Sequence, residues 1–386
     1  MPQAAPSDPE ALAPRSASVP LDRPDPLSGL AARLGPGPFA LVLMFVGAGA
    51  DLPRLLARAP AHFGRCAIAG CTTAGEIGEA GYADRSLVAV AFPEAGFAAG
   101  AVMIDPIDAI DSRDMIARLR KARQDLGRHA AQMPQELAIL LVDGMSGHEE
   151  HLVASLAGGL GPVRIVGGSA GDWRAFRQTQ VFCGQQLRRH AAAVLCLLRS
   201  PLAMRPFSFN SARPSRTQMV VTRADPAARA VLRINDEPAA PEYARLLGCD
   251  PVDLGPQTFA TRPLMVRAGG RHFVRAIRGI GPSGELMFFG AVAEGMVLTL
   301  SDPSDMAAHL GDSLAGLAAQ GTPRMVLGFD CIFRRMDAEA RQQTRPVSDL
   351  LARHRVRGFS TYGEQTGGMH VNQTLTGVAF YDPAPA

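Results

Sequence analysis

One short phrase occurs three times along the chain, and it constrains the fold more than any other feature of the sequence. Residues 70–76 read Gly-Cys-Thr-Thr-Ala-Gly-Glu, and residues 358–364 read Gly-Phe-Ser-Thr-Tyr-Gly-Glu. A looser middle copy at 167–172, Gly-Gly-Ser-Ala-Gly-Asp, is one residue shorter and ends in an aspartate. Because self-similarity of this kind marks repeated structural units, the chain is expected to build one unit three times.

The segments before the three copies are also alike. Each copy follows an apolar run, a helical stretch and a second short apolar run. These segments are 39–46, 52–63 and 66–69; then 137–142, 149–160 and 163–166; then 325–329, 337–353 (interrupted by Pro346) and 356–358. Each unit therefore predicts a strand, a helix, a strand and then a turn made of glycine, hydroxyl and acid.

A turn of small residues after a buried strand is a candidate binding site. It leaves backbone N–H groups and hydroxyls free at the sheet edge, where they can bind an anion. We therefore expect the three turns to share one functional cleft. The carboxylate that ends each copy can accept from a cation. The alternative is that the glycines only make tight turns.

Composition narrows the functional class. A chain of 386 residues with 47% apolar content can form two domains with sizeable cores. The net charge of +3 and the scattered basic residues give no footprint for nucleic acid or a membrane surface. The longest apolar run, 39–48, is about half of what a spanning helix requires. Six cysteines without metal-binding spacing fit a reducing, cytoplasmic setting.

Three regions are expected along the chain. Residues 1–37, rich in proline and alanine, predict a disordered tail that ends in a short helix near 27–34. The first domain would span 38–223, with a β-hairpin of strands 87–92 and 97–104. The second would span 224–386 and begin with a short helix at 227–231. Together the elements predict an α+β fold: mixed, largely antiparallel sheets covered by helices, in two related halves.

The first and last phrases, together with Phe-Asp-Cys-Ile-Phe-Arg at 329–334, resemble the FIST family. The resemblance covers nearly all of the chain after residue 37. It implies a sensory module of FIST N-terminal and C-terminal domains that binds a small ligand, with amino acids as suspected ligands. Catalysis is not expected, because Cys71, which could serve as a nucleophile, is replaced by Phe359 in the third copy.

No fused kinase, cyclase or DNA-binding domain is expected in the chain. In this it is similar to the standalone FIST branch called nitric-oxide-sensing proteins, which bind haem b without a covalent bond. That resemblance implies a cytoplasmic sensor that binds haem and nitric oxide and regulates a separate histidine kinase or cyclic-di-GMP enzyme. The alternative that stays open is a haem-free amino-acid sensor. In it Thr72, Thr73 and Ser360 would hold the ligand carboxylate, and Glu76 or Glu364 would hold its ammonium group.

A haem ligand should be a neutral imidazole on a constrained backbone. His370 follows two glycines and precedes a strand, so it is the expected iron ligand, and Asn372 could orient its ring. His272 is the alternative ligand. Arg334 is a candidate partner for the haem propionates. The alternative is that it forms a surface ion pair, which contributes little.

Overall fold

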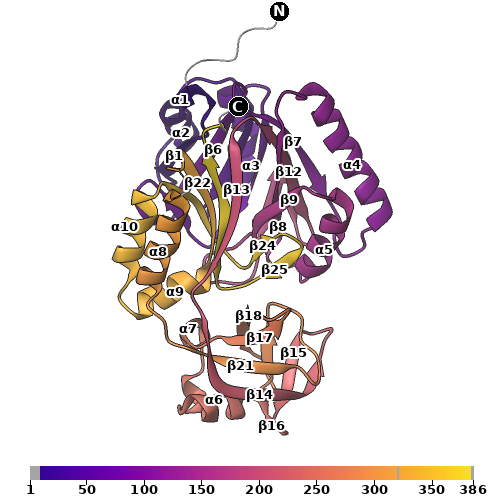
Figure 1. Cartoon of the computed structure of the whole chain (residues 1–386), viewed down its shortest axis with the longest axis vertical. Coiled ribbons are helices and arrows are strands. Elements are labelled where there is room, and N and C mark those ends of the chain that lie inside the picture. Colours follow the sequence, from indigo (N-terminus) through magenta and orange to yellow (C-terminus); the bar gives the residue numbers. More distant parts are fainter. Residues whose placement is uncertain (1–8, 320, 384–386) are drawn as a thin grey trace, which may run out of the picture.

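The computed structural model describes residues 9–319 and 321–383. They form a body of three related units and a smaller lobe, which lies beneath the body in Figure 1. The chain enters the lobe after β13 (Ala203–Asn210) and leaves it before α8 (Met306–Ala318). The lobe is therefore one insertion, joined to the body by two chain crossings.

The body contains three six-stranded sheets with one plan. A parallel pair lies inside each sheet: β2 (Phe39–Val46) with β3 (Ala67–Thr72), β8 (Gln135–Val142) with β9 (Arg164–Ser169), and β22 (Met325–Cys331) with β23 (Val356–Thr361). An antiparallel strand flanks each pair: β6 (Ser86–Pro93), β12 (Ala193–Ser200) and β26 (Thr374–Tyr381). The next strand outward is β1 (Arg15–Pro20), β7 (Ala98–Ile104) or β13. We call the three repeats the first, second and third units.

Helices join the strands of each parallel pair, so the predicted strand-helix-strand units are confirmed. They are α3 (Leu52–Phe63) in the first unit, α5 (Glu149–Leu160) in the second, and α9 (Ile332–Ala340) with α10 (Thr344–Arg353) in the third. The side chain of Asp51 caps α3 by accepting from the Arg54 amide. The helix predicted at 337–353 is two helices, and Pro346 lies in the first turn of α10, where proline is tolerated.

The hairpin after each phrase joins the sheet of another unit. β4 (Glu76–Gly78) and β5 (Gly81–Ala83) extend the third sheet, β24 (Glu364–Thr366) and β25 (Met369–Val371) extend the second, and β10 (Gln180–Cys183) and β11 (Gln186–Arg189) extend the first. The three units thus close into a ring. Its centre is apolar: the rings of Phe45 and Phe359 lie 4.7 Å apart, and Phe329 packs edge-on against both.

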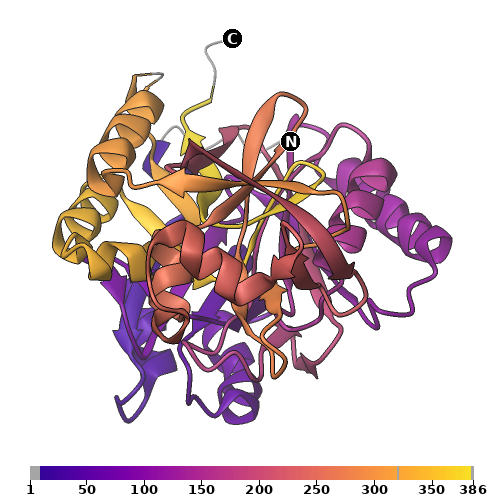
Figure 2. The same cartoon turned by 90° about the horizontal axis from the view of Figure 1, so that it is seen from below.

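The lobe consists mainly of an eight-stranded antiparallel sheet. Its strands are β14 (Arg213–Asp225), β15 (Ala230–Ile234), β16 (Glu237–Pro238), β17 (Leu264–Ala268), β18 (Arg271–Arg275), β19 (Ile277–Ile280), β20 (Leu286–Phe288) and β21 (Val297–Asp302). Two α-helices, α6 (Ala239–Leu247) and α7 (Pro256–Thr261), and the 3-10 helix η1 (Pro251–Asp253) complete it. Seen from below, the lobe lies across the middle of the body, and the indigo N-terminal region extends beyond it (Figure 2).

The prediction of a disordered tail over 1–37 is wrong for the residues that the structure describes. Residues 9–34 form α1 (Pro9–Leu12), β1 and α2 (Pro26–Leu34), and only the short helix near 27–34 was expected. β1 pairs with β6 and buries Ala17 and Val19 at alternate positions. In α2 the buried side chains are leucines at helical spacing, at positions 27, 30 and 34. Residues 1–8 lie outside the described part.

Two local predictions are also corrected, while the α+β class with mixed, largely antiparallel sheets is confirmed. The strands expected to form a hairpin, β6 and β7, belong to different sheets: β6 pairs with β1 and β2, and β7 pairs with β12. The helix expected at 227–231 is a turn leading into β15. The body also contains the helix α4 (Ser112–His129). In the described residues, no helix is long and apolar enough to cross a membrane.

Candidate functional site

The three turns predicted to share a cleft do meet, but they meet in a packed centre. Equivalent backbone N–H groups donate to equivalent carbonyls around the ring: Ala74 to Ser360 at 2.9 Å, Gly171 to Thr72 at 3.0 Å, and Tyr362 to Ser169 at 3.2 Å. Thr72, Thr73 and Ser360 are all at most 8% exposed. The turn amides therefore hold the units to one another, while the Ser360 hydroxyl has no hydrogen-bond partner among the described residues.

The first glycine of each phrase is required by close packing. A Cβ on Gly70, Gly167 or Gly358 would lie 2.0, 1.9 or 1.8 Å from a carbonyl oxygen of the neighbouring parallel strand. No neighbouring backbone can move enough to accept such a contact. The glycine repeat thus reports strand packing, not ligand approach.

The acids that end the first and last phrases are buried, and each binds a serine or threonine at the start of another strand. We call this contact a staple. Glu76 accepts from the hydroxyl of Thr73, and from the backbone N–H and hydroxyl of Ser86 at 2.9 and 2.7 Å. Glu364 accepts in the same way from Thr361, and from the N–H and hydroxyl of Thr374 at 3.1 and 2.8 Å. Burial raises the pKa of Glu76 and brings that of Glu364 to about 8. The structure thus gives both carboxylates intramolecular partners in place of the predicted ligand ammonium.

The middle phrase differs because it has lost this staple. Ala192 stands where the first and third units have Ser86 and Thr374, so there is no hydroxyl to bind. Asp172 instead accepts from the backbone N–H groups of residues 176–178 at 2.8 to 2.9 Å and from the hydroxyl of Tyr362.

The residue before Ser86, Ala192 or Thr374 has a left-handed backbone in every unit. We call the space at the carboxyl ends of each parallel pair the first, second or third crevice, after its unit; ligands of α/β sheets bind at such places. Arg85, Ala191 and Gln373 are equivalent, with φ of 49°, 45° and 54°. Arg85 lines a cavity of about 240 Å³ in the first crevice, and Gln373 lines one of about 20 Å³ in the third.

The lobe covers the second and third crevices, and we call this contact the junction. At the second crevice Arg229 donates to the carbonyls of Gly147 and Phe289 and faces Glu149 at 3.7 Å. Arg275 forms an ion pair with Glu150 at 2.9 Å. Burial, offset in part by Arg229, raises the pKa of Glu149 to about 7. Two arginines of the lobe, Arg229 and Arg275, therefore hold it against the first turn of α5.

At the third crevice the junction encloses Arg334, which is 2% exposed. Its Nε donates to Asp330 at 2.6 Å and its Nη1 to Ser211 at 3.2 Å. The small cavity beside it has room for about one water molecule. Gln373 closes it by donating to lobe carbonyls of α7 at 3.2 and 3.3 Å.

Several buried polar atoms at the junction have no hydrogen-bond partner among the described residues. They are Asp143 Oδ2, Glu149 Oε2, Arg275 Nε, Gln365 Oε1 and Asn372 Oδ1. Asn372 touches the lobe directly through a backbone bridge to Val274. Because a buried polar atom without a partner costs stability, this group marks a place for a ligand or water. Sequence reasoning missed Asp143, Glu149 and Gln365, although an Asp-Gly loop after a buried strand was a usable signal.

His370 lies in this group. It is 6% exposed, and its Nδ1 lies 3.4 Å from the side-chain amide of Gln365. Burial, with the charges of Arg229 and Arg275, lowers its pKa to about 3, so the imidazole is neutral. The alternative ligand His272 lies in lobe strand β18, the strand whose Val274 bridges Asn372.

The fit of haem to these residues is incomplete. The neutral imidazole suits an iron ligand, but the ring is buried and lies against neighbouring backbone. A Cβ on Gly363 would lie 2.2 Å from its ring, so backbone packs against that face. Arg334, the expected propionate partner, is committed to Asp330. The donor is suitable, and the space is not present in this arrangement.

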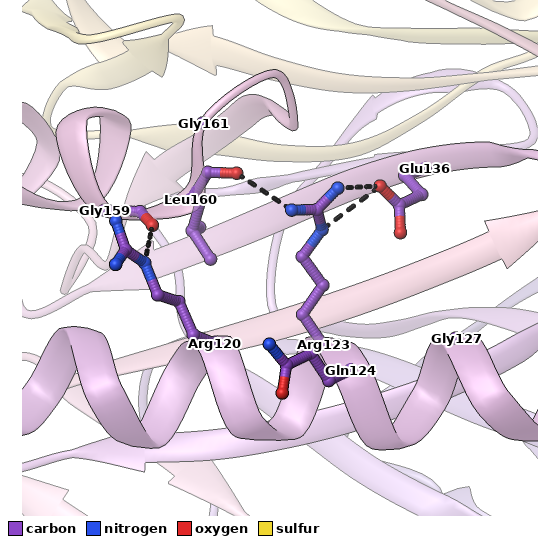
Figure 3. Close-up of a pocket in the computed structure, with 8 residues that line it drawn as sticks. All are labelled: Arg120, Arg123, Gln124, Gly127, Glu136, Gly159, Leu160 and Gly161. Carbon is purple, nitrogen blue, oxygen red and sulfur yellow. Dashed lines mark hydrogen bonds and ion pairs between the residues drawn. The ribbon is translucent and has the colours of Figure 1, made fainter.

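The cavity with the greatest volume, about 480 Å³, lies between α4 and the end of α5 (Figure 3). Its arginines already have partners. Arg120 donates to the Gly159 carbonyl at 2.8 Å, and Arg123 donates to the Leu160 carbonyl and to Glu136. These contacts satisfy the last backbone carbonyls of α5. The two arginines thus have a structural role that requires no ligand.

Fold and site together define a module of three repeated α+β units, with an inserted lobe over polar crevices and no group of three or more metal-ligating side chains among the described residues. The FIST N domain model matches residues 40–237 and the FIST C domain model matches 239–366. The chain therefore belongs to the FIST family, whose domains are small-ligand sensors of signal-transduction proteins. No curated protein matches it. Both the family boundary and the predicted one at 223–224 fall inside the lobe.

Proposed function

We propose that the chain senses a small ligand at the junction and that the ligand changes how the lobe sits on the body. The observation that carries this proposal is the group of buried polar atoms beneath the lobe that lack a hydrogen-bond partner among the described residues. Only two chain crossings join the lobe to the body. A ligand can shift such an arrangement by binding one position of the lobe better than another.

The unpartnered atoms favour an amino acid as the ligand. Four of the five are oxygens that can accept a hydrogen bond, and these suit an ammonium group. The fifth, Arg275 Nε, suits a carboxylate. The amino-acid hypothesis thus moves from Glu76 and Glu364 to Asp143, Glu149 and Asn372.

Titration of the purified full chain with the common amino acids tests this proposal. We expect saturable heat with at least one of them, weakened at least ten-fold by Asn372→Ala and by Glu149→Gln. Glu94→Gln, which alters an exposed turn, is the matched control and should bind as the wild type does. If no amino acid binds, or if the control loses as much affinity, the junction is not the site.

Haem and nitric oxide remain the second candidate, and the neutral buried imidazole of His370 favours it. Haem would require the lobe to move away from β25. An absorption spectrum of the protein with added haem is decisive, for the wild type and for His370→Ala. A Soret band that nitric oxide shifts and the variant lacks would support haem; a band unchanged in the variant would exclude His370 as the ligand.

For the signalling role we propose a separate histidine kinase or cyclic-di-GMP enzyme as the partner, which the family's place in signal transduction supports. We place the protein in the cytoplasm, since its six cysteines are free. A catalytic role is not proposed. Cys71 is fully buried and burial raises its pKa, so the reactive thiolate does not form at neutral pH.

A further inference from the structure

The three crevices are equivalent in the fold but differ in what covers them. The lobe covers the second and third crevices. The first crevice is outside the lobe and holds the cavity of about 240 Å³. We propose that this first crevice is a separate binding site, for a small dianion that carries a phosphate or two carboxylates.

Guanidinium groups from separate elements line this cavity. Arg23 comes from the loop before α2, Arg54 and Arg58 from α3, and Arg85 from the turn before β6. Arg58 is occupied, because it forms an ion pair with Asp25 at 2.5 Å. Within residues 9–319 and 321–383, the other three arginines take part in no ion pair.

The carboxylates of the same cavity do not balance these charges. Asp25 accepts from the Ser28 amide and from Arg58, and these contacts lower its pKa. Asp51 caps α3 and is therefore committed to the helix itself. Asp22 is the one remaining acid in the lining, against three unpaired guanidinium groups. The excess positive charge favours an anion, and guanidinium groups suit carboxylate and phosphate oxygens.

The repeated phrase fixes the geometry of this site. Glu76 holds both the N–H and the hydroxyl of Ser86, and this sets the left-handed backbone of Arg85 just before it. The Arg85 carbonyl in turn accepts from Leu21, which holds the loop that carries Arg23. A Cβ on Gly47 would lie 3.0 Å from the Arg85 backbone, so the loop after β2 packs directly on this turn. The backbone that carries Arg85 and Arg23 is therefore fixed before a ligand binds, which lowers the entropy lost on binding.

The segment that completes the cavity lies outside the family match. The FIST N domain match begins at residue 40, whereas residues 21–27 form one wall of the cavity. The site is therefore built partly by residues that the family model does not include, and it stands apart from the junction.

Calorimetric titration of the full chain with inorganic phosphate and with succinate tests the proposal at low ionic strength. We expect saturable binding of at least one probe, weakened at least ten-fold in Arg85→Gln and in Arg54→Gln. Binding of phosphate alone would assign a phosphate ester, and binding of succinate alone a dicarboxylate. Arg65→Gln, an exposed arginine outside the cavity, is the matched control.

Two results would overturn the site: no saturable binding of either probe, or equal weakening in Arg65→Gln. Circular dichroism checks that each variant is folded. Arg54 lies on the exposed side of α3, so its variant keeps the test valid if Arg85→Gln does not fold. The junction variants Asn372→Ala and Glu149→Gln should leave anion binding unchanged, which separates this site from the amino-acid site.

Discussion

The first and third units carry the same phrase and use it in the same way, yet their crevices have different fates. In both, a glycine packs under a strand carbonyl, and a buried glutamate holds a serine or threonine. In both, the residue before that hydroxyl is left-handed. The third crevice is closed by the lobe, and the first remains open. The phrase therefore builds the scaffold, and the cover over each crevice decides what it can bind.

The second unit shows which parts of the phrase the ring requires. It retains the glycine that packs against a strand carbonyl. It also retains the backbone hydrogen bond from its turn to the neighbouring turn. It has lost the hydroxyl at Ala192 and the glutamate. Glycine packing and turn-to-turn hydrogen bonds are thus common to all three units, whereas the acid staple occurs in two.

The largest effect is expected from Gly70→Ala. The new methyl group would meet the Met44 carbonyl and the Phe182 ring, so the variant should lose about 3 kcal/mol or more of stability. Equilibrium unfolding in urea measures the loss. Gly100→Ala is the matched control, since nothing lies within 4 Å of its added Cβ. Equal stability of the two variants would contradict the packing role of the glycine.

A pH-dependent effect of about 2 kcal/mol is expected from Glu364→Gln. The folded state raises the pKa of Glu364 from 4.5 to about 8, so between these values the folded protein binds a proton that the unfolded chain releases. The wild type should therefore lose stability as pH rises from 5 to 7. The glutamine variant does not titrate and should lose about 2 kcal/mol less, measured by urea unfolding at both pH values.

The control for this pH effect is Asp108→Asn, which changes an exposed acid and should keep the wild-type pH dependence. Glu149 titrates in an overlapping range, because its pKa is about 7, so the comparison is made between variant and wild type. An unchanged slope in Glu364→Gln would mean that this staple is already ionised in the folded protein.

A smaller effect, about 1.5 kcal/mol, is expected from Arg229→Gln at the junction. The change removes donors to Gly147 and Phe289 and leaves Glu149 without its cation. Amide hydrogen exchange should quicken in the lobe strands β15 and β20 and stay unchanged in the body. Arg118→Gln on the exposed side of α4 is the control. Faster exchange throughout the body would show that the lobe and body do not move separately.

Much of the body could be predicted from the sequence because its signals are local. Apolar runs and helical spacing gave the bounds of β2, α3 and α5 almost to the residue. The order of strands could not be predicted, since the hairpins pair across units. Sequence patterns do not show which strands pair. For the same reason β6 and β7 were wrongly predicted to form a hairpin, although their partners lie in different sheets.

The candidate site was predicted only in part. The three turns do come together, as expected, but Glu76 and Glu364 face inward because Ser86 and Thr374 lie in distant strands that sequence spacing cannot place. The junction depends on an inserted lobe whose contact with α5 has no local signal. His370 was chosen for its glycine neighbours, and the structure places it at the junction with a neutral ring.

The smallest expected effect compares the two staples directly. Ser86→Ala and Thr374→Val each remove one hydroxyl bond to a buried carboxylate and should each cost about 1 kcal/mol, because the backbone N–H bond remains. Ala192→Ser in the second unit is the control. The second unit has no glutamate to accept from the new hydroxyl, so stability should not rise. Urea unfolding compares the three variants. Equal losses in the first and third units would establish one staple used twice, whereas a much larger loss at Thr374 would show that the covering lobe depends on its staple more than the open crevice does.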